Sequence, residues 1–390
     1  MKHERRIFND SNKIVAVLST ITMTKTNTSD AGHSIIHSTF VPTVDRCGDI
    51  SLQISNIRRA IEEIEKEMNV SAFFVRVHLS DVATQADCVK GAFADKNLAL
   101  SIVGQSPMPL SKVQAIAMFE SGIEISSVDA NTILVDNGID KCYWTYNYVD
   151  ANVNVDSYSQ THRQLERYEK MLADNGMNIA DNCVRTWFFV RDIDCNYNGV
   201  VVGRRENFLQ NGLTPDTHYI ASTGIEGKYE DHKVLSILDA YAVKNIPTDK
   251  IQILYAAENM NKTIEYGVTF ERGVCVHHSG YKQIYISGTA SIDTKGDVLH
   301  VGDIKGQVKR MTENVNALLV EAGCKWDDIA QATVYLRDIA DYEVAYNELR
   351  KIMPDGQFII VQAPVCRPTW LIEMEAIAVA NENEDENEKS

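Results

Sequence analysis

Several marks of secreted and membrane-bound chains are missing from this sequence of 390 residues. Its 8 cysteines are scattered, with no CxxC pair and no spacing typical of a metal site. This usage indicates a reducing compartment rather than a disulfide-stabilised domain. No run approaches the roughly 18 apolar residues that a membrane helix needs, and the first residues lack the apolar core of a signal peptide. We therefore expect a cytoplasmic protein that does not contact membranes.

Positive charge is scarce as well. The chain has 38 Lys and Arg against 54 Asp and Glu, which gives a net charge of −16. Non-specific affinity for nucleic acid comes from clustered Lys and Arg, so we expect no nucleic-acid partner. A hydrophobic content of 44%, with only 8 prolines, is nevertheless typical of a folded chain with a sizeable core. The length predicts two or three domains.

Cofactor motifs are also missing. No GxGxxG or GxxxxGK[ST] loop opens a helix, so nothing in the sequence indicates nucleotide binding. His277 and His278 are adjacent, and adjacent side chains of a strand point to opposite faces. Neither they nor His300 have an acidic or cysteine partner at a ligand spacing. We therefore expect neither a metal site nor a cofactor.

A repeated order of helices and strands is the main positive feature of the sequence. Each third of the chain shows apolar residues at helical spacing, then a strand, a second helix and two further strands. In the last third we expect helices at 305–319 and 342–352 and strands at 332–336, 358–362 and 371–379. In the middle third we expect helices at 160–173 and 204–209 and strands at 186–190, 218–221 and 234–242. In the first third, a helix from residue 57 precedes strands at 73–79, 98–103 and 112–119.

The closing strands support this repeat because their sequences match. They read QAIA at 114–117, DAYA at 239–242 and EAIA at 375–378. We expect three units, at residues 1–121, 122–246 and 247–380, followed by a disordered acidic tail at 381–390. Alternating helices and strands predict an α+β fold of βαβ-rich units, with helices covering one face of each sheet.

The last unit resembles the YjgF/RidA family, whose members are single units that associate as trimers. This resemblance rests on residues 286–289, 302–304, 313–315, 334–338 and 372–378. A narrower resemblance is to the chorismatase family, which builds its C-terminal domain on the same fold. It rests on residues 287–292, 299–303 and 365–367 with Glu373, and on 185–187 and 221–225 in the middle unit. The resemblance implies tandem YjgF/RidA-like (chorismate-mutase-like) units packed as a pseudo-trimer, in a monomer or homodimer.

Chorismatases cleave the enol ether of chorismate, releasing pyruvate and a cyclohexadiene or hydroxybenzoate product. The resemblance implies that Glu373 is the general acid, a role that burial supports by keeping a carboxyl protonated. On an alternating strand Glu373 shares its face with Leu371, Glu375 and Ile377, so it lies beside apolar residues, which predicts such burial. The repeat places Lys112 and Ile237 at the equivalent positions, so we expect one active site per chain, between the middle and C-terminal units.

Substrate contacts follow from the chemistry of a dicarboxylate, because the planar fork of arginine binds a carboxylate bidentately. The candidates are Arg185, Arg204, Arg205, Arg272, Arg337 and Arg367, among which we favour Arg205 and Arg367 and retain Arg185. The resemblance also places Tyr266, Thr289, Ala290 and Gly224 at the binding site. It adds Cys366 to the catalytic residues, although no histidine near it in sequence could activate it, so we expect a pocket-lining thiol.

Three departures from these families leave alternatives open. Deaminating YjgF relatives hold the substrate carboxylate with an arginine at a position that falls near Phe358 here. Glu226 stands where chorismatases would have a glycine, and Glu265 stands where they would have a glutamine. An enamine or imine deaminase and a non-catalytic protein that binds small carboxylates therefore remain as alternatives. Ribonuclease activity, which is sometimes attached to the YjgF family, fits poorly with the net charge of −16.

Overall fold

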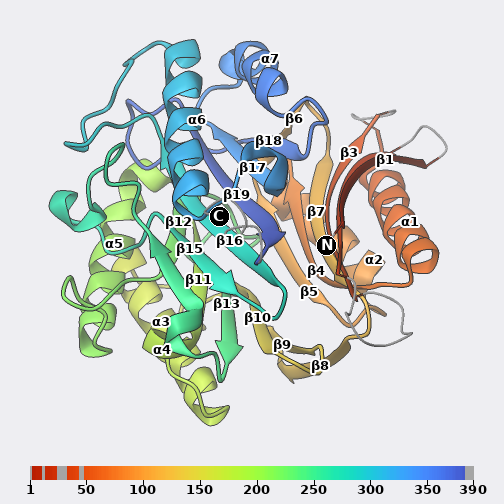
Figure 1. Ribbon diagram of the computed structural model, residues 1–390, viewed down its shortest axis with the longest axis horizontal. Coiled ribbons are helices and arrows are strands. Elements are labelled where there is room, and N and C mark those ends of the chain that lie inside the picture. Colours follow the sequence, from red (N-terminus) through yellow and green to blue (C-terminus); the bar gives the residue numbers. More distant parts are fainter. Residues whose placement is uncertain (1, 11–13, 24–32, 44–47, 383–390) are drawn as a thin grey trace, which may run out of the picture.

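The computed structural model describes residues 2–10, 14–23, 33–43 and 48–382. Three mixed sheets follow one another along the chain, and each carries helices on its outer face. Figure 1 shows the strands gathered in the middle, with α1 and α2, α3 to α5, and α6 and α7 on three sides. The expected α+β fold of three repeated units is confirmed.

The N-terminal sheet has the strand order β1-β2-β3-β7-β4-β5. Its strands are β1 (Lys2–Asp10), β2 (Ile14–Met23), β3 (His33–Pro42), β4 (Ser71–Leu79), β5 (Ala99–Gly104) and β7 (Val113–Glu120). Helices α1 (Ile50–Met68) and α2 (Val82–Phe93) cover one face. The carboxylate of Asp49 caps α1 by accepting from Ser51 N at 2.9 Å. Ile54, Ile57 and Ile61 then recur at helical spacing and are buried against the sheet.

The middle sheet has the order β12-β11-β13-β10-β9-β8. Its strands are β8 (Glu124–Asp129), β9 (Thr132–Asp136), β10 (Lys141–Tyr148), β11 (Cys183–Val190), β12 (Ala221–Glu226) and β13 (Ser236–Lys244). Its helices are α3 (Ser157–Asp174), the short α4 (Ile179–Asn182) and α5 (Ile193–Gln210). The parallel pair of β11 and β12, joined through α5, is a βαβ unit.

The C-terminal sheet has the order β14-β15-β16-β19-β17-β18-β6. Its strands are β14 (Ile251–Leu254), β15 (Gly273–His277), β16 (Tyr281–Ala290), β17 (Ile329–Leu336), β18 (Phe358–Gln362) and β19 (Ile372–Asn381), with helices α6 (Ile304–Glu321) and α7 (Tyr342–Ile352). The last strand in that order, β6 (Ser106–Met108), comes from the first third of the chain and pairs antiparallel with β18. The N-terminal and C-terminal units are therefore joined by backbone hydrogen bonds.

One apolar core is shared by the three sheets. Its buried residues include Phe74 from β4, Trp187 from β11 and Tyr285 from β16. Helices α1 and α2 bury their apolar faces in a smaller cluster, and α3 and α5 do so in another, whereas α6 and α7 pack on the shared core. None of the helices in the described part of the chain is long and apolar enough to cross a membrane.

Three details of the predicted elements were wrong. Helix α5 begins at Ile193 rather than near residue 204, and β12 covers Ala221–Glu226 rather than 218–221. The sequence did not indicate that α5 starts at Ile193, because Gly199 and Gly203 interrupt its helical pattern. Packing against α3 requires these glycines, since a Cβ on Gly199 would lie 2.7 Å from Tyr158 N. In addition, antiparallel strands precede the first helix of each unit, and these were not predicted. Of the expected disordered tail, Asn381 ends β19, and residues 383–390 lie outside the described part of the chain.

The equivalence of Lys112 with Glu373 was also wrong. The strand that follows the first helix of each unit (β17, β11 and β4) has a bulge. At the same distance beyond the bulge lie Tyr335, Phe189 and His78 respectively. These residues pair with Glu373, Ile237 and Gln114 respectively. Gln114 is therefore the N-terminal counterpart of Glu373. The similar tetrapeptide at 114–117 had shifted the alignment by two residues.

Candidate active site

A cavity of about 460 Å³ lies between the middle and C-terminal units. The middle unit lines it with α5 and β12, and the C-terminal unit lines it with β16, β19 and the loop at 366–370. The segment before β15 contributes Gly267, Val268, Phe270 and Arg272. Both polar and apolar side chains therefore face the same cavity, as in many small-molecule sites.

Glu373 is the acid of this cavity. It lies on β19 between Ala290 of β16 and Tyr335 of β17 in the ladder, and only 5% of its surface is exposed. Burial raises the pKa of the Glu373 carboxyl to about 8 and the nearby Glu375 carboxylate adds to the rise, while Arg272 and Arg185 oppose it. At neutral pH Glu373 is therefore mostly protonated and can donate a proton.

Gly288 makes room for that carboxyl group. It lies in a bulge of β16, where the register with β19 shifts between Ile286 and Thr289. A Cβ on Gly288 would lie 2.8 Å from Glu373 Cδ, and still closer to Oε1. Its backbone N–H donates to Thr223 Oγ1 at 2.9 Å, which ties the bulge to β12 of the middle unit. No larger residue fits there without displacing the acid.

Four arginines line the cavity: Arg204, Arg205, Arg272 and Arg367. Arg204 and Arg272 are 2% and 4% exposed, and their guanidinium carbons lie 5.9 and 5.6 Å from the ring centre of Phe270. Arg204 also donates to Ser222 Oγ at 3.3 Å. Arg272 Nη2 in addition donates to Asn261 O at 3.1 Å. The cavity is thus locally cationic in an acidic protein.

The structure brings most of the predicted site residues together. Glu373, Cys366, Arg205, Arg367, Ala290 and Gly224 all line the cavity. The Cys366 thiol is no candidate nucleophile, because burial raises its pKa to about 12. The side chain of Tyr266 lies outside the described residues. The roles that the resemblance implies for these residues stay predictions.

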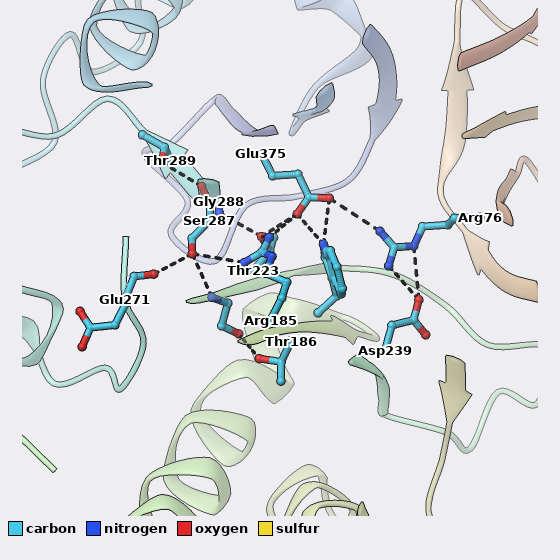
Figure 2. Close-up of polar contacts among 12 residues, drawn as sticks. Arg76, Arg185, Thr186, Thr223, Asp239, Glu271, Ser287, Gly288, Thr289 and Glu375 are labelled. Atoms are coloured by element: carbon cyan, nitrogen blue, oxygen red, sulfur yellow. Dashed lines mark hydrogen bonds and ion pairs between the residues drawn. The ribbon is translucent and has the colours of Figure 1, made fainter. Parts of the chain in front are cut away.

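Arg185 and Thr289 are not among the residues that line the cavity. Arg185 is buried and forms an ion pair with Glu375, with Nη2 2.9 Å from Oε2 (Figure 2). Thr289 is buried as well and donates from Oγ1 to Ser287 O at 2.9 Å. Arg337, a candidate of lower rank, forms an ion pair with Asp194 at 2.9 Å and donates to Val365 O. These side chains support the site instead of facing it.

Sequence reasoning weighed Arg204 and Arg272 without favouring them, and it missed Tyr197, Thr223, Phe270 and Trp370. Tyr197, Val201, Arg204 and Arg205 recur at helical spacing on α5 and all line the cavity. This spacing was a signal, but it is visible only if the helix is taken to start at Ile193. Thr223 lies within the segment 221–225 that carries the chorismatase resemblance, but only its neighbour Gly224 was chosen. For Phe270, which comes from a loop, the sequence carries no comparable signal.

The structure places the three departures at Glu226, Glu265 and Phe358 in different surroundings. The carboxylate of Glu226 accepts from the backbone N–H groups of Ile193 and Asp192, at 2.6 and 3.1 Å. It therefore caps the N-terminus of α5, the helix that carries two of the arginines. Glu265 is exposed. Phe358 begins β18 and is buried, so the arginines of this cavity come from other elements.

Comparisons with known proteins match the C-terminal unit. Residues 271–380 match the Endoribonuclease L-PSP family. A RutC family protein of Pyrococcus abyssi is 37% identical over 97 residues, which cover 24% of this chain and 76% of that protein. The 3-aminoacrylate deaminase RutC of Acinetobacter baylyi is 31% identical over 97 residues, covering 24% and 77% of the two chains.

One solved structure matches most of the chain. A chorismatase crystal structure superposes with a TM-score of 0.60, covering 79% of this chain and 93% of the other. The sequences are 16% identical, so the likeness establishes a shared fold. Because this match covers 79% of the chain, it extends well beyond residues 271–380, which the family match covers.

Proposed function

The chain belongs to the RutC family through its C-terminal unit, and we propose that it cleaves the enolpyruvyl ether of chorismate or a closely related dicarboxylate. The products are pyruvate and either a dihydroxycyclohexadienoate or a hydroxybenzoate. The observation that carries this proposal is a buried Glu373, with a pKa raised to about 8, in a cavity lined by four arginines. The shared fold with a chorismatase supports it.

The first chemical step is proton transfer from the Glu373 carboxyl to the methylene carbon of the enol ether. The two electrons of the C=C bond form the new C–H bond, and an oxocarbenium ion remains. In the hydrolytic outcome, water adds to that ion and returns a proton to the Glu373 carboxylate. The resulting hemiketal collapses to pyruvate and the ring alcohol, so one water is consumed. General acid catalysis of this kind contributes about 10² to 10⁴ in rate.

The arginines account for binding of a dianion by an acidic protein. Arg204 and Arg272 are buried near Phe270, while Arg205 and Arg367 complete the cationic lining. Asp194 also lines the cavity but is already paired with Arg337. Each carboxylate can therefore be held by guanidinium groups, because charge-assisted bidentate hydrogen bonds are among the strongest available to a protein. Binding both carboxylates orients the enol ether toward Glu373.

The proposal is tested by incubating the purified full-length chain with chorismate and measuring pyruvate with a lactate dehydrogenase assay. We expect pyruvate release that falls at least about 100-fold in Glu373→Gln, because the amide cannot supply the proton. Glu343→Gln, at an exposed position of α7, is the matched control and should keep the wild-type rate. No pyruvate above the blank, or an undiminished rate in Glu373→Gln, would contradict the proposal.

The second candidate function is the deamination of an enamine or imine. It is favoured by the 31% identity with the 3-aminoacrylate deaminase of Acinetobacter baylyi. The buried Phe358, in place of the arginine typical of deaminating relatives, argues against it. The same protein assayed for ammonia with amino-acid-derived imines decides between the two. Ammonia release without cleavage of chorismate would replace the first proposal with the second.

A further inference from the structure

A second carboxylate lies next to the acid of the cavity without reaching the cavity itself. Glu375 is two residues beyond Glu373 on β19, and so it lies on the same face of the strand. It is 7% exposed and is not among the residues that line the cavity. Its contacts are therefore with protein groups.

Most of those groups are donors from the other two units, and Tyr335 of β17 is a further partner from the same unit. Glu375 Oε2 accepts three hydrogen bonds: from Arg185 Nη2 at 2.9 Å, from Thr223 Oγ1 at 2.6 Å and from Trp187 Nε1 at 3.0 Å. Arg76 of the N-terminal unit adds an ion pair at 3.7 Å. Figure 2 shows Arg185 and Thr223 on one side of Glu375 and Arg76 on the other. We call Arg76, Arg185, Trp187 and Thr223 the Glu375 anchor residues.

Two of the anchor residues also bind the bulge of β16 next to Glu373. Arg185 Nη1 donates to Ser287 Oγ at 3.2 Å, and Thr223 Oγ1 accepts from the N–H of Gly288 at 2.9 Å. Gly288 is the residue whose missing side chain leaves room for the Glu373 carboxyl. Arg185 and Thr223 thus contact both Glu375 and the bulge that leaves room for the Glu373 carboxyl.

We propose that Glu375 is a positioning residue for Glu373: bound by its anchor residues, it keeps a fixed negative charge beside the acid and so keeps the proton on Glu373. This inference rests on the function proposed above, since it assigns Glu375 a part in the same acid step. A like charge held nearby disfavours ionisation of a carboxyl, and low solvent access strengthens the effect. Accordingly, Glu375 is the second cause, after burial, of the raised pKa of Glu373.

Other charged and titratable groups lie around Glu373 on several elements. Arg272 precedes β15 and Arg185 lies on β11; both oppose the rise in the pKa of Glu373. Arg204 and Arg205 line the same cavity from α5, and Cys366 and Arg367 line it from the loop before β19. Tyr335 of β17 is the ladder partner of Glu373. Within the ion pair of Glu375 and Arg185, the Glu375 charge raises the pKa of Glu373 more than the Arg185 charge lowers it.

The test is a carboxyl titration by NMR of the full-length protein labelled with δ-¹³C glutamate. The Glu373 signal is the one lost in Glu373→Gln, and its midpoint in the wild type should lie at about 8. Glu375→Gln keeps the size and most of the hydrogen bonding while removing the charge. We expect the Glu373 midpoint to fall by about one pH unit. An unchanged or raised midpoint would overturn the inference.

A matched control is available in the middle unit. Asp239 is buried as well, 0% exposed against 7% for Glu375, and it is bound by Arg76 at 2.8 Å, whereas Arg76 lies 3.7 Å from Glu375. Asp239→Asn should destabilise the fold to a similar degree but leave the Glu373 midpoint in place. A midpoint that moves as far in Asp239→Asn as in Glu375→Gln would mean a general loosening of the core, and it would overturn the specific role of Glu375.

A fallback variant covers the case in which Glu375→Gln does not fold. Arg185→Gln combined with Glu375→Gln removes both buried charges, which is often tolerated better than breaking the pair. Because the effect of Glu375 is the larger of the two, the midpoint should still fall, by less than in the single variant. A midpoint at or above the wild-type value would overturn the inference.

The titration needs no turnover, so it separates this inference from the proposed function. A chain that releases no pyruvate contradicts the function, whereas the midpoint still decides the role of Glu375. If chorismate is cleaved, the alkaline limb of kcat/KM should move with the midpoint. Glu375→Gln would then lose about tenfold in rate at pH 9 and little at pH 6. A purely structural role would lower the rate equally at both pH values.

Discussion

Two neighbouring interfaces of this chain have the same plan, but only one of them holds the cavity described above. Between the N-terminal and middle units, Arg76 binds Asp239 at 2.8 Å and Ser101 Oγ donates to the same carboxylate at 2.5 Å. Between the middle and C-terminal units, Arg185 and Thr223 bind Glu375 in the same way. The difference lies in the residues that flank these ion pairs.

The flanking residues are small at one interface and large at the other. In β10 the bulge between Thr145 and Tyr148 contains Asn147, which corresponds to Gly288 in the bulge of β16. Asn147 faces Ile102 of β5: its Nδ2 donates to Ile102 O at 2.9 Å, and its Oδ1 accepts from Ile102 N at 2.7 Å.

The strands that face these two bulges, β5 and β12, also differ in the size of their side chains. Ile102 pairs with Val77 in the parallel ladder of β4 and β5, as Gly224 pairs with Phe188 in that of β11 and β12. Gly224 and Gly288 both line the cavity, whereas Ile102 and Asn147 are joined side chain to backbone. Two glycines on facing strands therefore open the space that an asparagine and an isoleucine fill at the other interface.

The largest expected effect comes from closing the open interface. Gly288→Asn introduces the residue of the middle unit, and its Cβ would collide with the Glu373 carboxyl. We expect pyruvate release from chorismate to fall about 100-fold or more, because a displaced acid no longer reaches the enol ether. Gly91→Asn, at a helical glycine with open space around it, is the control and should keep the wild-type rate. An undiminished rate in Gly288→Asn would refute the importance of this position.

The order of secondary structure could be predicted because it depends on local patterns. Helix α7 and strand β18 have the predicted bounds, since their apolar periodicity and flanking polar residues lie within the segment itself. Helix α5 was predicted too short because Gly199 and Gly203 weaken its pattern locally, although packing against α3 requires them. Its cap, Glu226, comes from another strand and leaves no mark near residue 193.

The candidate site was only partly accessible for the same reason. Glu373 could be chosen because strand alternation placed it among apolar residues, and the family resemblance supplied its role. Its neighbour Glu375 binds Arg185 and Arg76, which lie 190 and 299 residues before it in the sequence. Nothing in a linear pattern joins such distant residues, so Arg185 was assigned to the substrate when its partner is a carboxylate of the protein. The contribution of Gly224 and Gly288 to the cavity depends on the strands that face them, which the linear sequence does not show.

The acid itself provides a second difference between the interfaces. Glu373 corresponds to Ile237 in the middle unit, and only the glutamate titrates. Its pKa is about 8 in the folded chain against an ordinary 4.5, so between these values the folded chain holds a proton that the unfolded chain has lost. Raising the pH through this window therefore favours unfolding, by at most about 1.4 kcal/mol for each pH unit.

Glu373→Gln removes that titration. We expect the free energy of unfolding of the variant, relative to wild type, to increase steadily between pH 5 and pH 8, as measured by urea denaturation at several pH values. Glu343→Gln at the surface of α7 should show a difference from wild type that does not change with pH. A Glu373→Gln difference that is equally flat would mean that the acid ionises normally, and general acid catalysis at neutral pH would lose its basis.

The smallest effect is expected from opening the closed interface. Asn147→Gly leaves the N–H and C=O of Ile102 without their partners at the edge of β5, and such losses typically cost about 1–3 kcal/mol each. Asn147 has a φ of 43°, where glycine is favoured, so relief of backbone strain offsets part of this loss. Asn245→Gly, at an exposed residue with a φ of 59°, measures that relief alone. Urea denaturation should show Asn147→Gly to be less stable than wild type by about 1–3 kcal/mol and Asn245→Gly to be nearly neutral. Pyruvate release should be unchanged in both variants, because the closed interface supplies no acid. Equal stability of the two variants would show that Asn147 contributes nothing to the interface, and the contrast between the two interfaces would then rest on the glycines alone.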